Sequence, residues 1–121
     1  MSSDDQSNLR VAVVGACASG KSTLVTALRA MGFDARHVAQ DHSFVPDMWR
    51  RIGQPDVLIF LDVNYETIKA RRPKTTYRRS DLAEQERRLA HARENCNLSI
   101  NTNPLAPEDV LAQALSFLNS L

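Results

Sequence analysis

Two glycines, a lysine and a serine near the start of the chain stand at a spacing that suits phosphate binding. The segment GACASGKS, from Gly15 to Ser22, fits the pattern G-x-x-x-x-G-K-[ST] at every fixed position. Glycines let the backbone turn successive N–H groups inward as a nest for anions, and a helix that begins there adds its positive N-terminal end. We therefore expect a phosphate-binding loop whose contacts come from Gly15, Ala18, Ser19, Gly20, Lys21, Ser22 and Thr23.

Lys21 and Ser22 have separate roles in such a loop. The ammonium group of Lys21 would reach the β- and γ-phosphates, and the hydroxyl of Ser22 would face Mg²⁺. Replacing Lys21 should lower the affinity for ATP or GTP and leave folding little affected, because a lysine that faces phosphate is not part of the core. The alternative is a chance match, in which the glycines only form turns and Lys21 is a surface charge.

A carboxylate is also needed near Ser22 to hold Mg²⁺, directly or through water. Asp62 ends the clearest apolar run of the chain, and Asp41 follows a weaker one. By pattern alone Asp62 is the stronger candidate, although an aspartate at the end of a strand is commonly only a cap or turn residue. The pattern leaves the choice between the two open.

A second concentration of charge is the Arg-rich segment, residues 69–79, which holds six basic residues and no acidic one. The planar guanidinium group of arginine grips phosphate oxygens through two parallel hydrogen bonds. The segment could therefore neutralise charge on a phosphoryl group, and it could equally be a solvated basic loop. Its candidate arginines are Arg71, Arg72, Arg78 and Arg79.

Short β-like runs alternate with helix-like stretches along the chain. Strands are predicted over 9–14, 33–40, 56–63 and 98–101, and helices over 22–31, 44–52, 64–72, 81–95 and 107–121. The apolar runs lack clear alternation, which is typical of parallel strands that are buried on both faces. Four strands, each followed by a helix, predict an α/β protein with a parallel sheet.

Composition and charge limit further what kind of protein this can be. The chain has 121 residues and a net charge of +1, so we expect one domain over 9–121 behind a disordered tail, 1–8. A nearly neutral net charge argues against general nucleic-acid binding, and no apolar run is long enough for a membrane helix.

The two cysteines and the N-terminus concern the location of the protein. Cys17 and Cys96 are far apart and the N-terminus is polar, so we expect a cytoplasmic location and no disulfide. His37 and His91 are expected to lie at the surface without partners.

The order of these features resembles the P-loop kinases of the nucleoside monophosphate kinase and shikimate kinase type. The resemblance rests on the phosphate-loop motif, on the run DVLIFLDVNYETIKA, on the Arg-rich segment with the helix behind it, and on the closing NLSINTNPLAPEDVLAQALSFL. It implies the P-loop NTPase fold: a three-layer sandwich with a four-stranded parallel sheet of order 2-1-3-4, flanked by helices. The nucleotide site would lie at the carboxyl ends of the strands.

The resemblance also implies residue roles. The Arg-rich segment would be a lid, with Arg72 and Arg78 at the transferring phosphoryl group. Asp41, rather than Asp62, would serve Mg²⁺ together with Ser22, and Asn103 would lie beside the adenine base. The N-K-x-D motif that reads guanine is missing from the sequence, which favours ATP without excluding GTP. The implied activity is phosphoryl transfer from ATP with Mg²⁺ to a small molecule, with Lys21, Asp41, Arg72 and Arg78 as catalytic residues.

One departure from that family limits the inference. Only residues 30–34 separate the first predicted helix from the second strand, so the helical insert that holds the phosphoryl acceptor is missing. The acceptor would have to be held by residues 41–51, by the lid or by a second copy in a homodimer. The rival hypotheses are a nucleotide-binding module that acts with a partner protein, and a slow NTP hydrolase.

Overall fold

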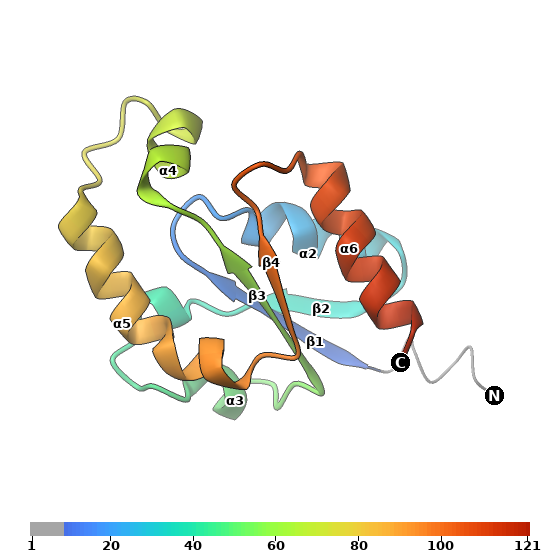
Figure 1. The fold of residues 1–121 in the computed structure, drawn as a ribbon. Coiled ribbons are helices and arrows are strands. Elements are labelled where there is room, and N and C mark those ends of the chain that lie inside the picture. The colour runs from blue at the N-terminus through green and yellow to red at the C-terminus, as the bar shows by residue number, and fades with distance from the viewer. Residues whose placement is uncertain (1–8) are drawn as a thin grey trace.

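The computed structural model describes residues 9–121, so the predicted tail over 1–8 lies outside the described residues. Its centre is a four-stranded sheet, drawn in Figure 1, in which every strand pair is parallel. The order β2-β1-β3-β4 confirms the predicted order 2-1-3-4. The strands are β1 (Arg10–Gly15), β2 (Asp34–His37), β3 (Val57–Asp62) and β4 (Leu98–Asn101).

The two central strands are buried on both faces, as their continuous apolar runs predict. In β1, Val11 and Val13 pack into the core on one face, and Ala12 and Val14 pack into the core on the other. Strand β3 divides its side chains between the two cores in the same way. The sheet is therefore the middle layer of three.

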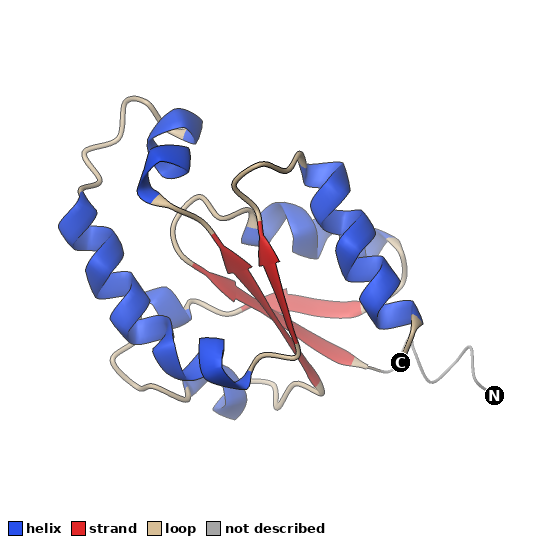
Figure 2. Cartoon of the chain, viewed as in Figure 1, coloured by secondary structure: helices blue, strands red, loops and turns tan. Residues whose placement is uncertain are grey.

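Helices form the two outer layers (Figure 2). Helices α2 (Lys21–Ala30) and α6 (Pro107–Asn119) contribute Leu28 and Leu118 to the core on one face. Helix α5 (Arg79–Asn95) covers the other face, where it is joined by the short α3 (Met48–Arg51) and α4 (Tyr65–Arg71). Both α2 and α4 begin at the carboxyl ends of strands, and that edge of the sheet carries the polar residues described below.

Local chemistry explains where α4 and α6 begin. The Asn64 side chain accepts a hydrogen bond from the backbone N–H of Thr67 at 2.8 Å and so caps α4. Pro107 occupies the first turn of α6, where a missing N–H costs nothing, and Asp109 accepts from the N–H of Ala106 at 3.2 Å. These starts agree with the sequence prediction.

The helix predicted over 44–52 is wrong for most of its length, because only Met48–Arg51 is helical. Three of its apolar residues, Phe44, Val45 and Ile52, are exposed rather than aligned on a buried face. The reason is Gln40, which is fully buried. It donates to the Val45 carbonyl at 2.8 Å and accepts from the Trp49 N–H at 2.8 Å, and so holds this stretch in a loop.

Strand β2 is also shorter than predicted, since the chain leaves it after His37 and forms a 3-10 turn, η1 (Gln40–His42). Within the described residues, no helix is both long and apolar enough to cross a lipid bilayer.

Candidate functional site

The β1–α2 loop, residues 16–20, connects the central strand to α2 and carries the predicted phosphate motif. Gly15 precedes it at a close approach between strands. A Cβ atom there would lie 2.7 Å from the Leu61 carbonyl oxygen and 2.6 Å from Ser19 Oγ. Only glycine fits at this point, because β3 lies directly against the strand end.

The loop backbone contains two left-handed residues, Ala18 with φ of 59° and Gly20 with φ of 98°. Left-handed residues that alternate with right-handed ones turn backbone N–H groups toward a common centre. None of the described side chains caps the N-terminus of α2. Ser19 Oγ is buried and has no hydrogen-bond partner among the described residues. The loop therefore presents polar groups that an anion could satisfy.

Lys21 folds back over its own loop. Its Nζ donates to the Gly15 carbonyl at 2.7 Å and to the Ala16 carbonyl at 3.1 Å, and it lies 3.6 Å from Asp41 Oδ2. Burial lowers the pKa of Lys21, and the neighbouring Asp41 carboxylate partly offsets that effect. These contacts revise the expectation that Lys21 matters little for folding.

Asp41 comes from η1 and is almost completely buried, with 2% of its surface exposed. Its Oδ2 faces Lys21 and also lies 3.4 Å from His42 Nε2, whereas its Oδ1 has no described hydrogen-bond partner. A buried carboxylate oxygen without a partner is costly unless a ligand or water satisfies it. Asp41 is thus brought to Lys21, although it does not line the cavity described below, and its predicted metal role stays a prediction.

Asp62 has a different environment. Arg93 from α5 donates to both of its carboxylate oxygens, at 3.2 Å each. Because Arg93 occupies both oxygens of the carboxylate, this ion pair is enough to explain the aspartate at the end of β3, and no ligand has to be invoked. The two candidates thus differ in that Asp41 keeps a carboxylate oxygen without a described partner, whereas both oxygens of Asp62 are paired; which of them serves a metal stays a prediction.

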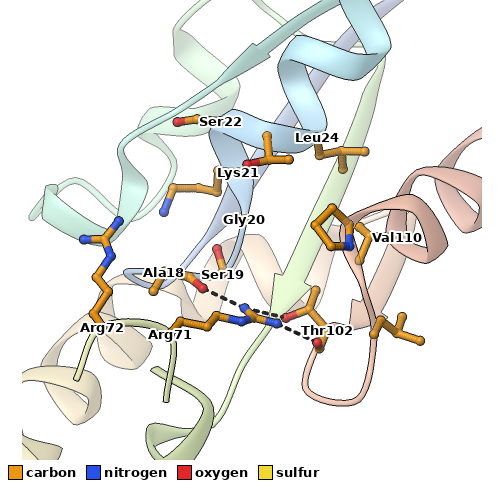
Figure 3. Close-up of a pocket in the computed structure, with 13 residues that line it drawn as sticks. Ala18, Ser19, Gly20, Lys21, Ser22, Leu24, Arg71, Arg72, Thr102 and Val110 are labelled. Atoms are coloured by element: carbon orange, nitrogen blue, oxygen red, sulfur yellow. Dashed lines mark hydrogen bonds between the residues drawn. The ribbon is translucent and has the colours of Figure 1, made fainter. Parts of the chain in front are cut away.

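A cavity of about 490 Å³ opens beside the β1–α2 loop (Figure 3). Arg71 forms one wall: its guanidinium donates to the Ala18 carbonyl at 2.7 Å and to the Thr102 carbonyl at 2.7 Å. These bonds tie the loop to the turn after β4. The cavity is lined by Ala18, Ser19, Gly20, Lys21, Ser22, Thr23, Leu24, Arg71, Arg72, Thr102, Leu105, Pro107 and Val110.

The arginines of the Arg-rich segment have distinct positions. Arg72 lines the cavity, and its guanidinium lies 3.5 Å from Cys17 Sγ. Arg78 does not line the cavity, because it stands just before α5, 3.6 Å from the Asp81 carboxylate. Arg79 pairs with Glu66 at 2.7 Å. Of the two arginines predicted to act on phosphate, the structure brings Arg72 to the loop and leaves Arg78 apart from it.

Asn103, predicted to lie beside a nucleobase, does not line the cavity either. Its side-chain oxygen accepts from the Asn64 N–H at 2.7 Å, and its amide donates to Asn101 at 2.6 Å. The neighbouring Thr102 faces the cavity instead. The apolar side chains at that end, Leu105, Pro107 and Val110, were predicted only as a turn and as the start of α6.

Sequence reasoning missed two buried glutamines and one histidine contact. Gln40 holds the chain around Asp41, as described above, and Gln85 on α5 accepts from the Cys17 N–H at 3.0 Å. His91, expected to have no partner, accepts from the Trp49 indole N–H at 3.1 Å. No signal in the sequence marks these residues, because glutamine and histidine on polar stretches ordinarily face solvent.

Among the residues that the structure describes, no three histidine, cysteine, aspartate or glutamate side chains gather as a metal site. No protein-family model matches the chain, and no curated protein has significant sequence similarity to it.

Proposed function

We propose that this chain is a P-loop NTPase-fold protein that binds ATP with Mg²⁺ and transfers its γ-phosphoryl group to a small molecule, as the P-loop kinases do. The proposal depends chiefly on one observation: the G-x-x-x-x-G-K-S motif stands between a buried parallel strand and a helix and opens into a cavity. GTP remains an alternative nucleotide.

Charge around the β1–α2 loop supports a triphosphate. Lys21 and Arg72 both line the cavity, so two cationic side chains are available to a bound polyphosphate. Burial is the main cause that lowers the pKa of Lys21, and its pairing with Asp41 leaves it one anionic neighbour before any ligand binds. On binding, Lys21 would exchange its bonds to the loop carbonyls for bonds to phosphate oxygens.

The other end of the cavity supports a nucleoside. Leu24, Leu105, Pro107 and Val110 give it apolar surface, and the Thr102 carbonyl and the Arg71 guanidinium add polar groups at its rim. Binding sites for nucleosides are typically apolar with a few polar groups that fix orientation. No carboxylate lines the described cavity at this end, so a strong preference for guanine has no structural support.

Ser22 and Asp41 fit a Mg²⁺ ion bound with the nucleotide. Ser22 lines the cavity, and Asp41, which lies beside Lys21 but outside the cavity lining, has a buried carboxylate oxygen without a described partner. When bound, the ion would neutralise charge on the β- and γ-phosphates. Lys21 would hold the γ-phosphate, and Arg72 would reach over it, so that charge and position carry the catalysis.

A second candidate function is a nucleotide-binding module without its own acceptor, which acts with a partner protein or hydrolyses NTP slowly. The observation that favours it is the short connection between α2, which ends at Ala30, and β2, which begins at Asp34. That connection leaves no room for an acceptor-binding insert. The two candidates share the same nucleotide site and differ in whether phosphate is transferred.

Calorimetric titration with ATP and GTP, with and without Mg²⁺, tests the shared site. We expect ATP·Mg to bind and, at one hundred times its Kd, to stabilise the fold by about 2.7 kcal/mol. Lys21→Met should weaken binding by at least about tenfold, since it removes a charge-assisted contact worth about 1.5–3 kcal/mol. No binding of either nucleotide at millimolar concentration would end the proposal.

Asp62→Asn is the matched control for Asp41→Asn. Both substitutions remove one carboxylate, that of Asp62 at the end of β3 and that of Asp41 in η1, but only Asp41 faces Lys21. We expect Asp41→Asn to abolish the Mg²⁺ dependence of ATP binding and Asp62→Asn to preserve it; the reverse result would assign the metal role to Asp62. Release of ADP in the presence of candidate acceptors, compared with ADP release in water alone, then separates transfer from slow hydrolysis.

A further inference from the structure

We propose that Gln85 is a positioning residue that couples the β1–α2 loop to the Arg-rich segment, so that Arg72 reaches a bound triphosphate only while this link is intact. This inference rests on the proposed nucleotide site, and it identifies a residue that positions Arg72 at that site. It is carried by three contacts: Gln85 and Arg72 each contact Cys17 in the loop, and Tyr77 contacts Gln85.

The central contact is a shared acceptor. Gln85 Oε1 accepts from the Cys17 backbone N–H at 3.0 Å and from the Tyr77 hydroxyl at 2.6 Å. An amide oxygen has two lone pairs, so these donors use its full capacity. Gln85 is 7% exposed, and hydrogen bonds shielded from water in this way hold geometry more firmly than exposed ones.

Tyr77 belongs to the Arg-rich segment and anchors it. Its ring stacks on that of Tyr65 at a centroid distance of 6.5 Å, and its carbonyl accepts from the Tyr65 hydroxyl at 3.2 Å. Burial raises the pKa of Tyr77, which keeps the phenol protonated as a donor to Gln85. Through Gln85, the far end of the segment is thus fixed to the loop.

The near end of the segment reaches the same residue. Arg72 approaches Cys17 Sγ at 3.5 Å, while Gln85 holds the backbone of Cys17. The two ends of the stretch from Arg72 to Tyr77 are therefore linked to one loop residue. Arg72 contacts the Cys17 side chain directly, and Tyr77 is linked to the Cys17 backbone N–H through Gln85. If the loop shifts when it binds phosphate, both ends must respond together, which is what coupling between the loop and Arg72 requires.

A double-mutant cycle on ATP affinity tests the coupling, with Gln85→Met and Arg72→Ala. Methionine keeps the length of the side chain and removes the acceptor. In the otherwise unchanged chain, Arg72→Ala should weaken ATP binding by about tenfold or more. In the Gln85→Met background the same replacement should weaken it by about threefold or less, because Arg72 is no longer positioned there.

Tryptic cleavage of the Arg-rich segment gives an independent readout. ATP should protect the segment in the unchanged chain and fail to protect it in Gln85→Met, even at saturating ATP. Gln113→Met is the matched control, because Gln113 lies on exposed α6 surface away from the loop, and it should keep both protection and the full Arg72 effect. Tyr77→Phe removes the other donor and should reproduce the smaller Arg72 effect, which keeps the test valid if Gln85→Met does not fold.

The outcomes separate the two proposals. An undiminished effect of Arg72→Ala in both Gln85→Met and Tyr77→Phe, with normal ATP binding by the unchanged chain, overturns the coupling and leaves the nucleotide site standing. Failure of the unchanged chain to bind ATP overturns the proposed function, and the coupling falls with it.

Discussion

The ion pair between Lys21 and Asp41 gives the sharpest prediction, because Asp41 is buried and Lys21 is only partly exposed. The Lys21 side chain is 15% exposed and that of Asp41 is 3% exposed, and Nζ lies 3.6 Å from Oδ2. At an effective dielectric constant of about 20, unit charges at this separation attract by about 4–5 kcal/mol before desolvation is subtracted. Removing one partner leaves the other charge buried, which is costlier than removing both.

The two single replacements should differ in cost. Lys21→Met removes the cation that lies 3.6 Å from the buried Asp41 carboxylate, so we expect a loss of about 3 kcal/mol in the free energy of unfolding. Asp41→Asn leaves Lys21 its bonds to the Gly15 and Ala16 carbonyls, and we expect a loss of about 1–2 kcal/mol. The double variant should lose about 2–3 kcal/mol, which is less than the sum of the single losses.

Urea denaturation at neutral pH measures these free energies without nucleotide, so the result does not depend on the proposed function. The slope of the transition has to be the same for all four proteins for the comparison to hold. Losses that add to within about 0.5 kcal/mol would show that Lys21 and Asp41 do not interact in the folded chain, and would refute the reasoning from their geometry.

Three further predictions concern stability. Gly15→Ala should destabilise the fold by about 1–3 kcal/mol, because its Cβ would press on the Leu61 carbonyl of β3, and thermal unfolding should show a lower midpoint. Gln40→Leu should cost about 2 kcal/mol or more in urea unfolding, because it leaves the buried Trp49 N–H without an acceptor; an unchanged midpoint would contradict the role given to Gln40. The raised pKa of Tyr77 means that the folded chain keeps a phenolic proton which the unfolded chain releases near pH 10.0, so the unfolded state binds fewer protons above that pH and stability falls as pH rises. Tyr77→Phe should flatten this alkaline decline in urea midpoints, and an identical decline in both proteins would assign it to other groups.

The arrangement of the sheet could be predicted from the sequence because its signals are local and agree with one another. Uninterrupted apolar runs predict strands covered on both faces, and the helices between them require parallel pairing. The motif around Lys21 marks the end of β1, and Asn64 and Pro107 mark helix starts through capping chemistry.

The features that the sequence did not predict depend on contacts between residues far apart in the chain. Spacing alone predicted a helix around Val45, but the side chain of Gln40 and its bond to the Arg88 carbonyl decide the path there. In the same way, residue type and the basic residues around them do not distinguish Arg72 from Arg78. The end of α4 places one at the cavity, and the start of α5 pairs the other with Asp81. Neither difference has a signature within a short window of sequence.

Both edges of the sheet are formed by strands of only four residues, β2 and β4. The β2 edge exposes Asp34, Arg36 and His37, and β4 exposes Ser99 and Asn101. Short, charged or polar edges resist pairing with a further strand. We therefore expect a second copy of the chain to join through helices or loops rather than by lengthening the sheet.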